Sequence, residues 1–500
     1  MSERLRAVCE LAVASVRENA GLHEYDGVVQ DMSPEGVRQG LSRLGGERLA
    51  DAHDEAHLSA GEEAARLALG KLELHRVNPL LHIDNLDLSC YDRSYAPAPE
   101  RAAARLRHLA AWPEAVDASL RSLDQVNRPV AAALLPAARG LAEGLRAGGN
   151  DTEAAALFAH GRLVAHLDHA AASGPEDASL GEAALAQLLS VREATEVSLA
   201  DLAARAEAEK GRLQDMLASA VARLAGGREV AEVVGELVRD HPDADGVLEA
   251  ARRQTDEVIA FTAAHRLVPY PEGQCRVGPA PASRRHAMAM MSWAAPGEED
   301  APSRYYITPP DSGWPAQDQE EWLSVFSDTT LPAVTAHEVA PGHFSHGRAL
   351  RHAPTPVRRV LISEAFTEGW AHYAEELCIE EGFHAGDPRF VIGVCIEALV
   401  RVTRLVCAIG IHTGEMSVEQ ATGRFIRDAY LRRRAARSEA ERATYDPTYG
   451  RYTWGKLEIM ALREEARHRW GSGYTNLRFH TALLGLGGPP LGLMGAALQG

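Results

Sequence analysis

Two neighbouring stretches, LPAVTAHEVAPGHFSH at residues 331–346 and SEAFTEGWAHYAEEL at residues 363–377, decide how the rest of the chain is interpreted. The first contains the pair His337-Glu338 and a second histidine, His343, and the second contains Glu368. Hydrolysis of an amide at zinc needs imidazole and carboxylate ligands around one cation, and a free carboxylate that accepts a proton. These two stretches supply all of those groups.

The spacing of the first two histidines departs from the usual motif. They are six residues apart, whereas H-E-x-x-H places its histidines four apart. At about 100° per residue, residues six apart on an unbroken helix diverge by roughly 120°. Pro341 and Gly342 favour a break, because proline disfavours helix at the preceding residue and glycine tolerates unusual dihedrals. We therefore expect both imidazoles to face one point. The alternative is a surface helix that ends at Pro-Gly with incidental histidines.

The second stretch places acidic and histidine side chains on one helical face. Glu364, Glu368, His372 and Glu375 follow one another at intervals of three or four residues. Two glutamates one turn apart repel each other, so a cation near them would relieve the repulsion. The distance in sequence from His343 to Glu368 suffices for a helix, a turn and a returning helix. The alternative is a solvated acidic face on an acidic protein.

At these residues the chain resembles a known family. HEVAPGH followed by AFTEGWAHYAEEL resembles the bacterial domain-of-unknown-function 885 family, and the likeness extends over most of the chain, to the closing Pro490-Leu491. That family is similar to mainly helical zinc peptidases of the gluzincin type. The Glu-Gly-Trp-Ala segment is also similar to the Glu-Gly-Phe-Ala of zinc aminopeptidases, in which the glutamate is the third metal ligand. This resemblance selects Glu368 over Glu364.

A second resemblance lies near the C-terminus. The run YDPTYGRYTW at residues 445–454 resembles the thimet-oligopeptidase family, in which tyrosines hydrogen-bond the substrate and the oxyanion. Tyr445, Tyr449 and Tyr452 match its three spaced positions. Without this likeness the same tyrosines would be interpreted as ordinary core aromatics. The resemblance also brings His412 near the site, although a lone histidine is more often a core residue, and Arg451 joins His412 as a candidate substrate-binding residue.

The residues and the resemblances together predict the ligands of one zinc ion per chain. His337, His343 and Glu368 are the candidate ligands, and Glu338 is the candidate general base. His346 is the reserve ligand, although nine residues from His337 place it on the far side of a regular helix.

Other side chains are expected to assist this centre. Tyr449 and Tyr452, with Tyr445 beside them, are candidate catalytic residues that donate hydrogen bonds to the tetrahedral oxyanion. Glu364 and His372 are expected to contact the metal ligands on the side away from the ion and to orient them.

A proline-rich segment between residues 268 and 314 interrupts the helical pattern. Within it, residues 287–293 and 303–308 are expected to pair as a small sheet beside the metal helix. An edge strand in such a position can hold a substrate backbone by strand addition. Tyr305 and Tyr306 are the candidate substrate-binding residues of this element. The alternative is a proline-rich connector.

The rest of the chain has the composition of helix. Hydrophobic residues make up 46% of 500 positions and aromatic residues 6%, which favours helices around a large core. We expect Pro113, Pro129 and Pro136 to break the helical pattern of residues 101–148. Together with the resemblance, this predicts a mainly α, zincin-like metallopeptidase fold with a small β element. An N-terminal helical region, 1–267, and a metal-site catalytic region, 268–500, would form one two-lobed unit.

Charge and hydropathy argue against two classes of binding partner, nucleic acids and membranes. The formal charge of −18 argues against general binding of nucleic acid, which needs a basic surface. The chain has no apolar run of the length of a signal peptide or of a membrane span. Its six cysteines form no C-x-x-C pair, so we expect reduced packing residues. These features predict a cytoplasmic protein that binds neither nucleic acid nor a membrane.

The sequence therefore predicts a zinc-dependent hydrolase that cleaves a peptide or related amide bond in a small substrate. Two alternatives stay open: a metal-dependent, non-hydrolytic enzyme of specialised metabolism acting on an amino-acid-like compound, and a non-catalytic helical binding protein. The sequence does not decide between zinc and another divalent ion, between exopeptidase and endopeptidase, or among oligomeric states.

Overall fold

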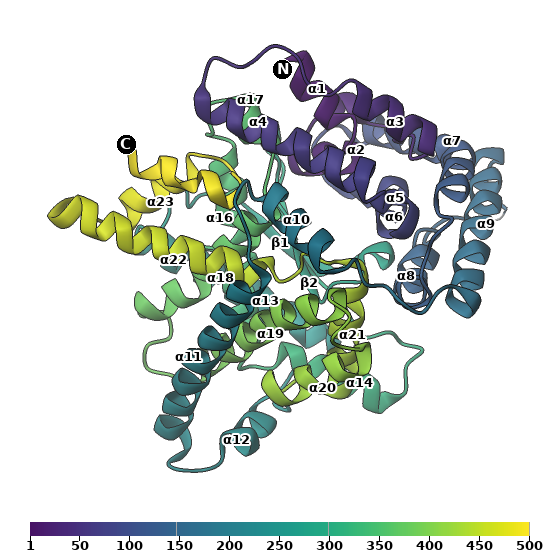
Figure 1. Ribbon diagram of the computed structural model, residues 1–500. Helices are drawn as coiled ribbons and strands as arrows, with labels where there is room; N and C mark the ends of the chain where they lie inside the picture. The colour runs from purple at the N-terminus through teal and green to yellow at the C-terminus, as the bar shows by residue number, and fades with distance from the viewer. Residues whose placement is uncertain (147, 299, 500) are drawn as a thin grey trace.

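The computed structural model of the protein describes residues 1–146, 148–298 and 300–499. Helices make up most of it, and one three-stranded sheet lies among them (Figure 1). The prediction of a mainly helical fold with a small β element is confirmed.

The N-terminal helices form the upper part of the molecule in Figure 1. Ser2, Ser33 and Asp51 precede three of them, and each side chain accepts a hydrogen bond from the backbone N–H three residues later. Such N-caps satisfy donors that a helix start would leave unpaired. The elements of this part are α1 (Glu3–Cys9), α2 (Val13–Asn19), η1 (His23–Tyr25), α3 (Pro34–Ser42), α4 (Ala52–Ala65), η2 (Arg66–Lys71), α5 (Leu74–Val77), α6 (Leu80–Leu86) and η3 (Ser89–Asp92).

Three long helices, α7 (Ala98–Ser122), α8 (Arg128–Gly140) and α9 (Asp151–Ser173), pack beside them around a separate hydrophobic core. Trp112, Leu134 and Leu163 are fully buried there. The predicted breaks at Pro113 and Pro136 are wrong, because both prolines lie inside helices. Tertiary packing of the flanking turns keeps these helices continuous despite the lost hydrogen bonds.

The next helices are α10 (Glu182–Arg192), α11 (Leu199–Ala225), α12 (Val230–Leu237) and α13 (Ala244–Ala264). They share one hydrophobic core with the C-terminal part of the chain, and α11 packs along α19 (Pro388–His412) more extensively than any other two elements pack. The core therefore does not divide at residue 267, where composition placed a boundary. The change in composition marks the start of the proline-rich segment rather than the end of a packed unit.

The sheet has the strand order β1-β3-β2, with β1 (Cys275–Pro279), β2 (Ala289–Ser292) and β3 (Ser303–Ile307). The predicted pairing of the second and third of these segments is confirmed: they run antiparallel, with Met290 opposite Tyr306. The parallel strand β1 was not predicted. Because β2 lies at the edge of this sheet and contacts α15 (Leu331–Glu338), its free side adjoins the His-Glu helix.

Two glycines set the spacing of the C-terminal helices. A Cβ on Gly369 of α18 would lie 2.4 Å from the backbone of Gly455 on α22, so the pair lets these helices approach closely. Glu368 and Tyr452 lie beside this contact and are thereby brought together.

The remaining elements of the C-terminal part are η4 (Ala282–Arg284), α14 (Ala316–Leu323), η5 (Ser324–Phe326), α15, α16 (His343–Leu350), α17 (Pro356–Val360), α18 (Glu364–Glu380), α19, α20 (Val418–Asp428), α21 (Arg433–Tyr445), α22 (Arg451–Trp470), η6 (Gly471–Gly473), α23 (Asn476–Leu484) and η7 (Leu491–Gln499).

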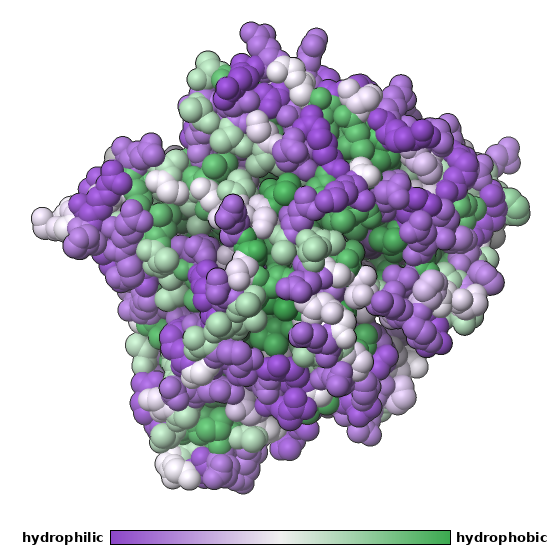
Figure 2. All heavy atoms as spheres, in the orientation of Figure 1, coloured by the Kyte–Doolittle hydropathy of each residue, from purple (hydrophilic) through white to green (hydrophobic). Residues whose placement is uncertain are grey.

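Hydrophilic residues cover most of the face seen in Figure 2, and hydrophobic residues show through near its centre, between the N-terminal and C-terminal helices. Among the described residues, no helix combines the length and the apolar character that crossing a membrane requires.

Candidate metal centre

The Pro-Gly step separates two helices. α15 ends at Glu338 and α16 begins at His343, and between them Val339 adopts φ −103° and ψ −98°, outside the helical region. A Cβ on Gly342 would lie 1.9 Å from the carbonyl oxygen of His337, so a larger residue does not fit. The break that the sequence predicts is present, and it turns His343 back toward His337.

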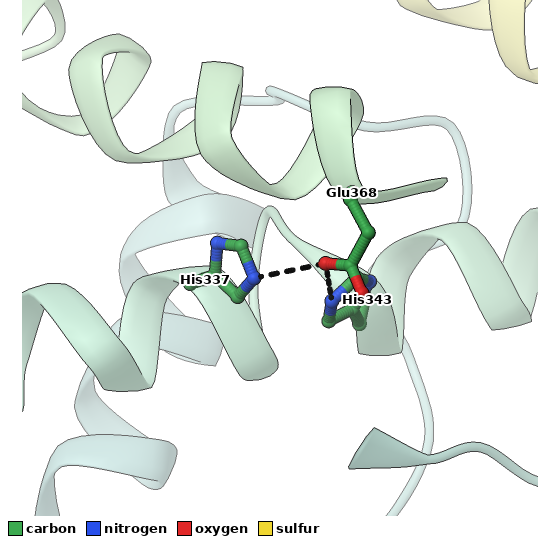
Figure 3. A group of neighbouring side chains, drawn as sticks. All are labelled: His337, His343 and Glu368. Atoms are coloured by element: carbon green, nitrogen blue, oxygen red, sulfur yellow. Dashed lines mark hydrogen bonds and ion pairs between the residues drawn. The ribbon is translucent and has the colours of Figure 1, made fainter. Parts of the chain in front are cut away.

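Figure 3 shows His337 and His343 pointing at the same carboxylate oxygen of Glu368. The Nε2 atoms of His337 and His343 lie 3.4 and 3.1 Å from Glu368 Oε2, and the three potential ligand atoms lie within 4.8 Å of one another. Zinc bonds of about 2.0–2.2 Å in a tetrahedron put neighbouring ligand atoms about 3.4 Å apart. The spacing and the chemistry of the donors therefore fit a zinc ion.

Glu375 fixes the orientation of His337. Its Oε1 lies 2.7 Å from His337 Nδ1, which leaves Nε2 directed at the cluster. Burial opposes ionisation of Glu375, but Arg401, whose Nη2 lies 3.3 Å away, and the neighbouring histidines hold the pKa of this carboxyl well below its usual range. Glu375 is thus a buried anion behind a candidate ligand.

The predicted supporting role of Glu364 is wrong. Its half-exposed side chain lies on the cavity wall, 3.7 Å from Arg192 Nη2 and 3.6 Å from Arg451 Nε. Glu375, two turns after Glu368 on α18, takes the position behind His337. The spacing of Glu375 in the sequence already put it on the right face, but nothing in the sequence showed which of the two carboxylates meets the histidine.

Two further histidines occupy different surroundings. His372 is fully buried, and its Nδ1 lies 3.4 Å from Glu375 Oε1, so it contacts the supporting carboxylate and not a candidate ligand. His346 Nε2 lies 3.0 Å from the carbonyl oxygen of Gly487, and burial lowers its pKa to about 4. The geometry therefore favours His343, and not His346, as the second imidazole of the cluster.

Glu338 lines the same cavity, and one of its carboxylate oxygens makes no hydrogen bond. Its side chain is largely buried, and Oε2 has no hydrogen-bond partner among the described residues. Burial raises the pKa of Glu338. A carboxylate with a raised pKa and an unengaged oxygen is suited to accept a proton.

The three predicted tyrosines lie in three different places. Tyr452 lines the cavity, and its ring lies 6.1 Å from that of His337, nearly parallel to it. Tyr449 is fully buried, and its hydroxyl donates to the carbonyl oxygen of Glu439 at 3.1 Å. Tyr445 packs in the core of α7, α8 and α9. The structure therefore does not bring Tyr449 and Tyr445 to the cavity wall, where Tyr452 lies. Tyr445 is the last residue of α21, Tyr449 lies in the turn that follows, and Tyr452 lies in the first turn of α22. Because the chain turns between the two helices, the three side chains point in different directions.

Of the four predicted substrate-binding residues, the structure places Arg451 on the cavity wall. Tyr305 and Tyr306 are buried on the central strand β3, and the edge strand β2 lines the cavity in their place. His412 Nε2 lies 2.8 Å from the carbonyl oxygen of Ala443, and burial lowers its pKa to about 4, as for a core histidine. Tyr305, Tyr306 and His412 are not among the described residues that line the cavity. Their assignment to the site stays a prediction.

The cavity has a volume of about 710 Å³ and lies between the N-terminal helices and the candidate metal cluster. The N-terminal helices contribute mostly apolar side chains, among them Val16, Leu69 and Leu81. The opposite wall carries the cluster and a group of five arginines, of which the sequence analysis had singled out one, Arg451: Arg192, Arg401, Arg404, Arg442 and Arg451. A cavity of this size and mixed lining suits a small organic ligand.

Comparisons with known proteins agree with this fold. The profile of the family described as "Bacterial protein of unknown function (DUF885)" matches residues 16–498. No curated protein matches the chain.

Two solved structures are similar over nearly their whole length. One is described as "a putative lipoprotein of unknown function" from Shewanella oneidensis (19% identity, TM-score 0.74, covering 98% of this chain and 97% of that one). The other is described as "the putative lipoprotein" from Colwellia psychrerythraea (17% identity, TM-score 0.72, covering 99% and 98%). At these identities the likeness shows the fold alone, and the cytoplasmic location of this chain stays a prediction.

Proposed function

Because the chain belongs to the DUF885 family of bacterial proteins of unknown function, we propose a function from the site itself: a metal-dependent hydrolase, with zinc as the expected ion, that cleaves a peptide or related amide bond in a small substrate. The observation that carries this proposal is the convergence of His337, His343 and Glu368 on one point of a cavity that also holds an unengaged carboxylate oxygen of Glu338. Two imidazoles and one glutamate are a donor set known from catalytic zinc sites, which leave the fourth position open.

His337, His343 and Glu368 would hold the ion. When bound, zinc supplies Lewis-acid polarisation of a carbonyl group and makes a water molecule nucleophilic at neutral pH. Glu375 keeps the His337 ring in the tautomer and orientation that direct Nε2 into the cavity.

Glu338 is the proton carrier of the proposed reaction. Its carboxylate accepts a proton from the attacking water and then delivers it to the leaving amine. Burial raises the pKa of Glu338, which makes its carboxylate a better acceptor than an exposed one.

Tyr452 is the candidate donor to the negative charge that develops on the substrate oxygen. Arg442 Nη2 donates to the Tyr452 hydroxyl at 3.3 Å, so the hydroxyl proton can point into the cavity. The ring already contacts His337. One well-placed donor of this kind accounts for about 10²–10³ in rate.

The edge strand β2 is the candidate support for the substrate backbone. Ala289, Met290 and Met291 line the cavity, and on the side away from β3 this strand has no partner in the described sheet. An extended peptide can add to such an edge through main-chain hydrogen bonds.

The proposal is tested by incubating the purified protein with a panel of dipeptides and oligopeptides, with and without a chelator, and identifying products by mass spectrometry. We expect cleavage that the chelator abolishes and added zinc restores. Cleavage that continues after complete removal of metal would contradict the proposed role of the cluster. A metal-loaded protein that converts amino-acid-like compounds without hydrolysis would favour the non-hydrolytic alternative, and a metal-free protein without turnover would favour the binding protein.

A further inference from the structure

We propose that the substrate carries a free carboxylate and that Arg442 and Arg451, on the wall beside Tyr452, bind it. This inference rests on the proposed function in one respect: it places the substrate in the same cavity as the candidate metal cluster. It adds the chemical class of the substrate, a short acidic or C-terminally free peptide.

Four guanidinium groups surround the ring of Tyr452. Their central carbons lie 4.7 Å (Arg404), 5.6 Å (Arg451), 5.9 Å (Arg442) and 6.0 Å (Arg401) from the ring centroid. All four residues line the cavity. The ring centroid of Tyr452 also lies 6.1 Å from that of His337, so these cations lie close to the candidate metal cluster.

Two of the four arginines are each paired with carboxylates of their own. Arg404 forms two hydrogen bonds with Glu439, at 2.6 and 2.7 Å. Arg401 contacts Glu397 at 3.1 Å and Glu375 at 3.3 Å. These two therefore have little charge left for a ligand.

The other two share one carboxylate. Arg442 Nη2 and Arg451 Nη1 lie 3.1 and 2.6 Å from the oxygens of Asp446. Glu364 lies between Arg451 and Arg192, at 3.6 and 3.7 Å. Arg192, Arg442 and Arg451 thus share two carboxylates, Asp446 and Glu364, so positive charge is in local excess around these three side chains. The excess is local, because Arg401 and Arg404 face three carboxylates. An excess charge beside a cavity favours an anionic ligand.

Arg451 also has an unsatisfied donor. It is 9% exposed, and its Nε is buried with no hydrogen-bond acceptor among the described residues. Among the same residues, no hydrogen bond engages Nη1 of Arg442. A buried guanidinium donor without an acceptor, such as Nε of Arg451, costs free energy. The free Nη1 of the partly exposed Arg442 can donate to a carboxylate.

Asp84, on α6, is an acidic group that faces the cavity from the opposite side. Its side chain is exposed to solvent, so its charge is screened there. The volume of about 710 Å³ limits the ligand to a short peptide.

The carboxylate can come from the C-terminus of a peptide or from an acidic side chain. The test uses Glu338→Gln protein loaded with zinc, so that binding is measured without turnover. Calorimetric titrations compare Ala-Ala-Phe with its C-terminal amide, and Ala-Glu-Phe-amide with Ala-Gln-Phe-amide. We expect the acid of at least one pair to bind about tenfold more tightly or better, as a charge-assisted hydrogen bond predicts.

The same titrations with Arg442→Gln should reduce that preference to about twofold, since the excess charge is gone. Arg442→Lys, which keeps the charge but loses the planar fork, serves if the first variant does not fold by circular dichroism, and should retain part of the preference. Arg437→Gln, on an exposed position of the same helix, is the matched control and should keep the full preference.

The outcomes separate this inference from the proposed function. A preference for the free C-terminus supports recognition of the α-carboxylate, and a preference for glutamate over glutamine supports recognition of a side chain. Equal binding within both pairs would overturn the inference even if the wild-type protein hydrolyses peptides. A clear preference for the acid without any hydrolysis by the wild-type protein would leave the inference standing and refute the proposed hydrolase.

Discussion

The two walls of the cavity differ in almost every chemical respect. The N-terminal wall, from α1 to α6, presents mainly alanine, valine and leucine, with Asp84 among them. The C-terminal wall presents the histidine–glutamate cluster, Tyr452 and five arginines. One wall therefore limits the size and polarity of a ligand, and the other holds the groups that can act on it. A site of this kind depends on both walls, although only one carries a recognisable motif.

The largest expected effect is the loss of the proton carrier on the C-terminal wall. Glu338→Gln should lower kcat by about 10²–10⁴ while zinc content stays unchanged, because the amide cannot accept the proton. Steady-state kinetics and mass-spectrometric metal analysis check both parts. Glu415→Gln, on the exposed surface, is the control. Undiminished turnover by Glu338→Gln would remove this residue from the mechanism.

The second largest effect is expected at the ion pairs of Arg284, which join the N-terminal helices to the segment beside the sheet. Arg284, beside the sheet, contacts Glu18 of α2 and Asp87 after α6, at 2.7 Å or less in each pair. Arg284→Met should lower the free energy of unfolding by about 3–5 kcal/mol, because Glu18 and Asp87, both largely removed from solvent, lose their ion-pair partner. Urea unfolding at pH 7 measures this loss.

Acid should weaken the same ion pairs in the wild-type protein. Burial opposes ionisation of Glu18 and Asp87, but Arg284 holds the pKa of each at about 2. In the unfolded chain both values are about 4. Their contribution to stability is therefore complete above about pH 5 and is lost as the pH falls from about 4 to about 2. The difference in unfolding free energy between the wild type and Arg284→Met should shrink over that interval. A difference independent of pH would contradict the ion-pair account.

Removal of the hydroxyl from Tyr452, in the cavity, or from Tyr449, in the core, compares the effect of the same change at the two places. Tyr452→Phe should lower kcat by about 10²–10³, since it removes the candidate donor to the oxyanion. Tyr449→Phe should leave kcat within about twofold and cost about 1 kcal/mol of stability, because its hydroxyl bonds a buried carbonyl. Kinetics and urea unfolding of both variants are the measurement. Equal losses of kcat would show that the two hydroxyls do not differ in the way their positions imply.

The smallest effect concerns the apolar wall. Ala65, at the end of α4, lines the cavity. Ala65→Leu should raise KM for a bulky peptide by about tenfold, because added methyl groups take up the space of the ligand. Zinc content should stay at the wild-type value, and Ala172→Leu, exposed on α9, should change neither quantity. An unchanged KM would show that the N-terminal wall does not contact the substrate.

The contrast between the walls also explains what the sequence could predict. His337, His343 and Glu368 were recognisable because metal ligands require particular side chains at restricted spacings. The Pro-Gly break was predictable for a related reason, since both residues have strong backbone preferences. The pairing of β2 with β3 followed from composition within a proline-rich segment.

Other features depend on tertiary contacts that no local pattern encodes. Glu364 and Glu375 share a helical face, and only the packing of α15 against α18 decides that Glu375 meets His337. Tyr449 and Tyr452 differ because one lies just before α22 and the other inside it. In the sequence, the alanines and leucines of the N-terminal wall look like those of any helical core, and Arg442 looks like an ordinary surface charge.

The account depends most directly on whether three side chains hold one ion. The decisive measurement is a zinc titration of metal-free protein, followed by metal analysis after gel filtration, for the wild type, His343→Ala and His346→Gln. We predict one zinc ion per chain in the wild type, its loss in His343→Ala, and its retention in His346→Gln, whose side chain bonds the Gly487 carbonyl instead. A wild-type protein that retains no zinc, or a His343→Ala variant that retains it as tightly as the wild type, would contradict the account.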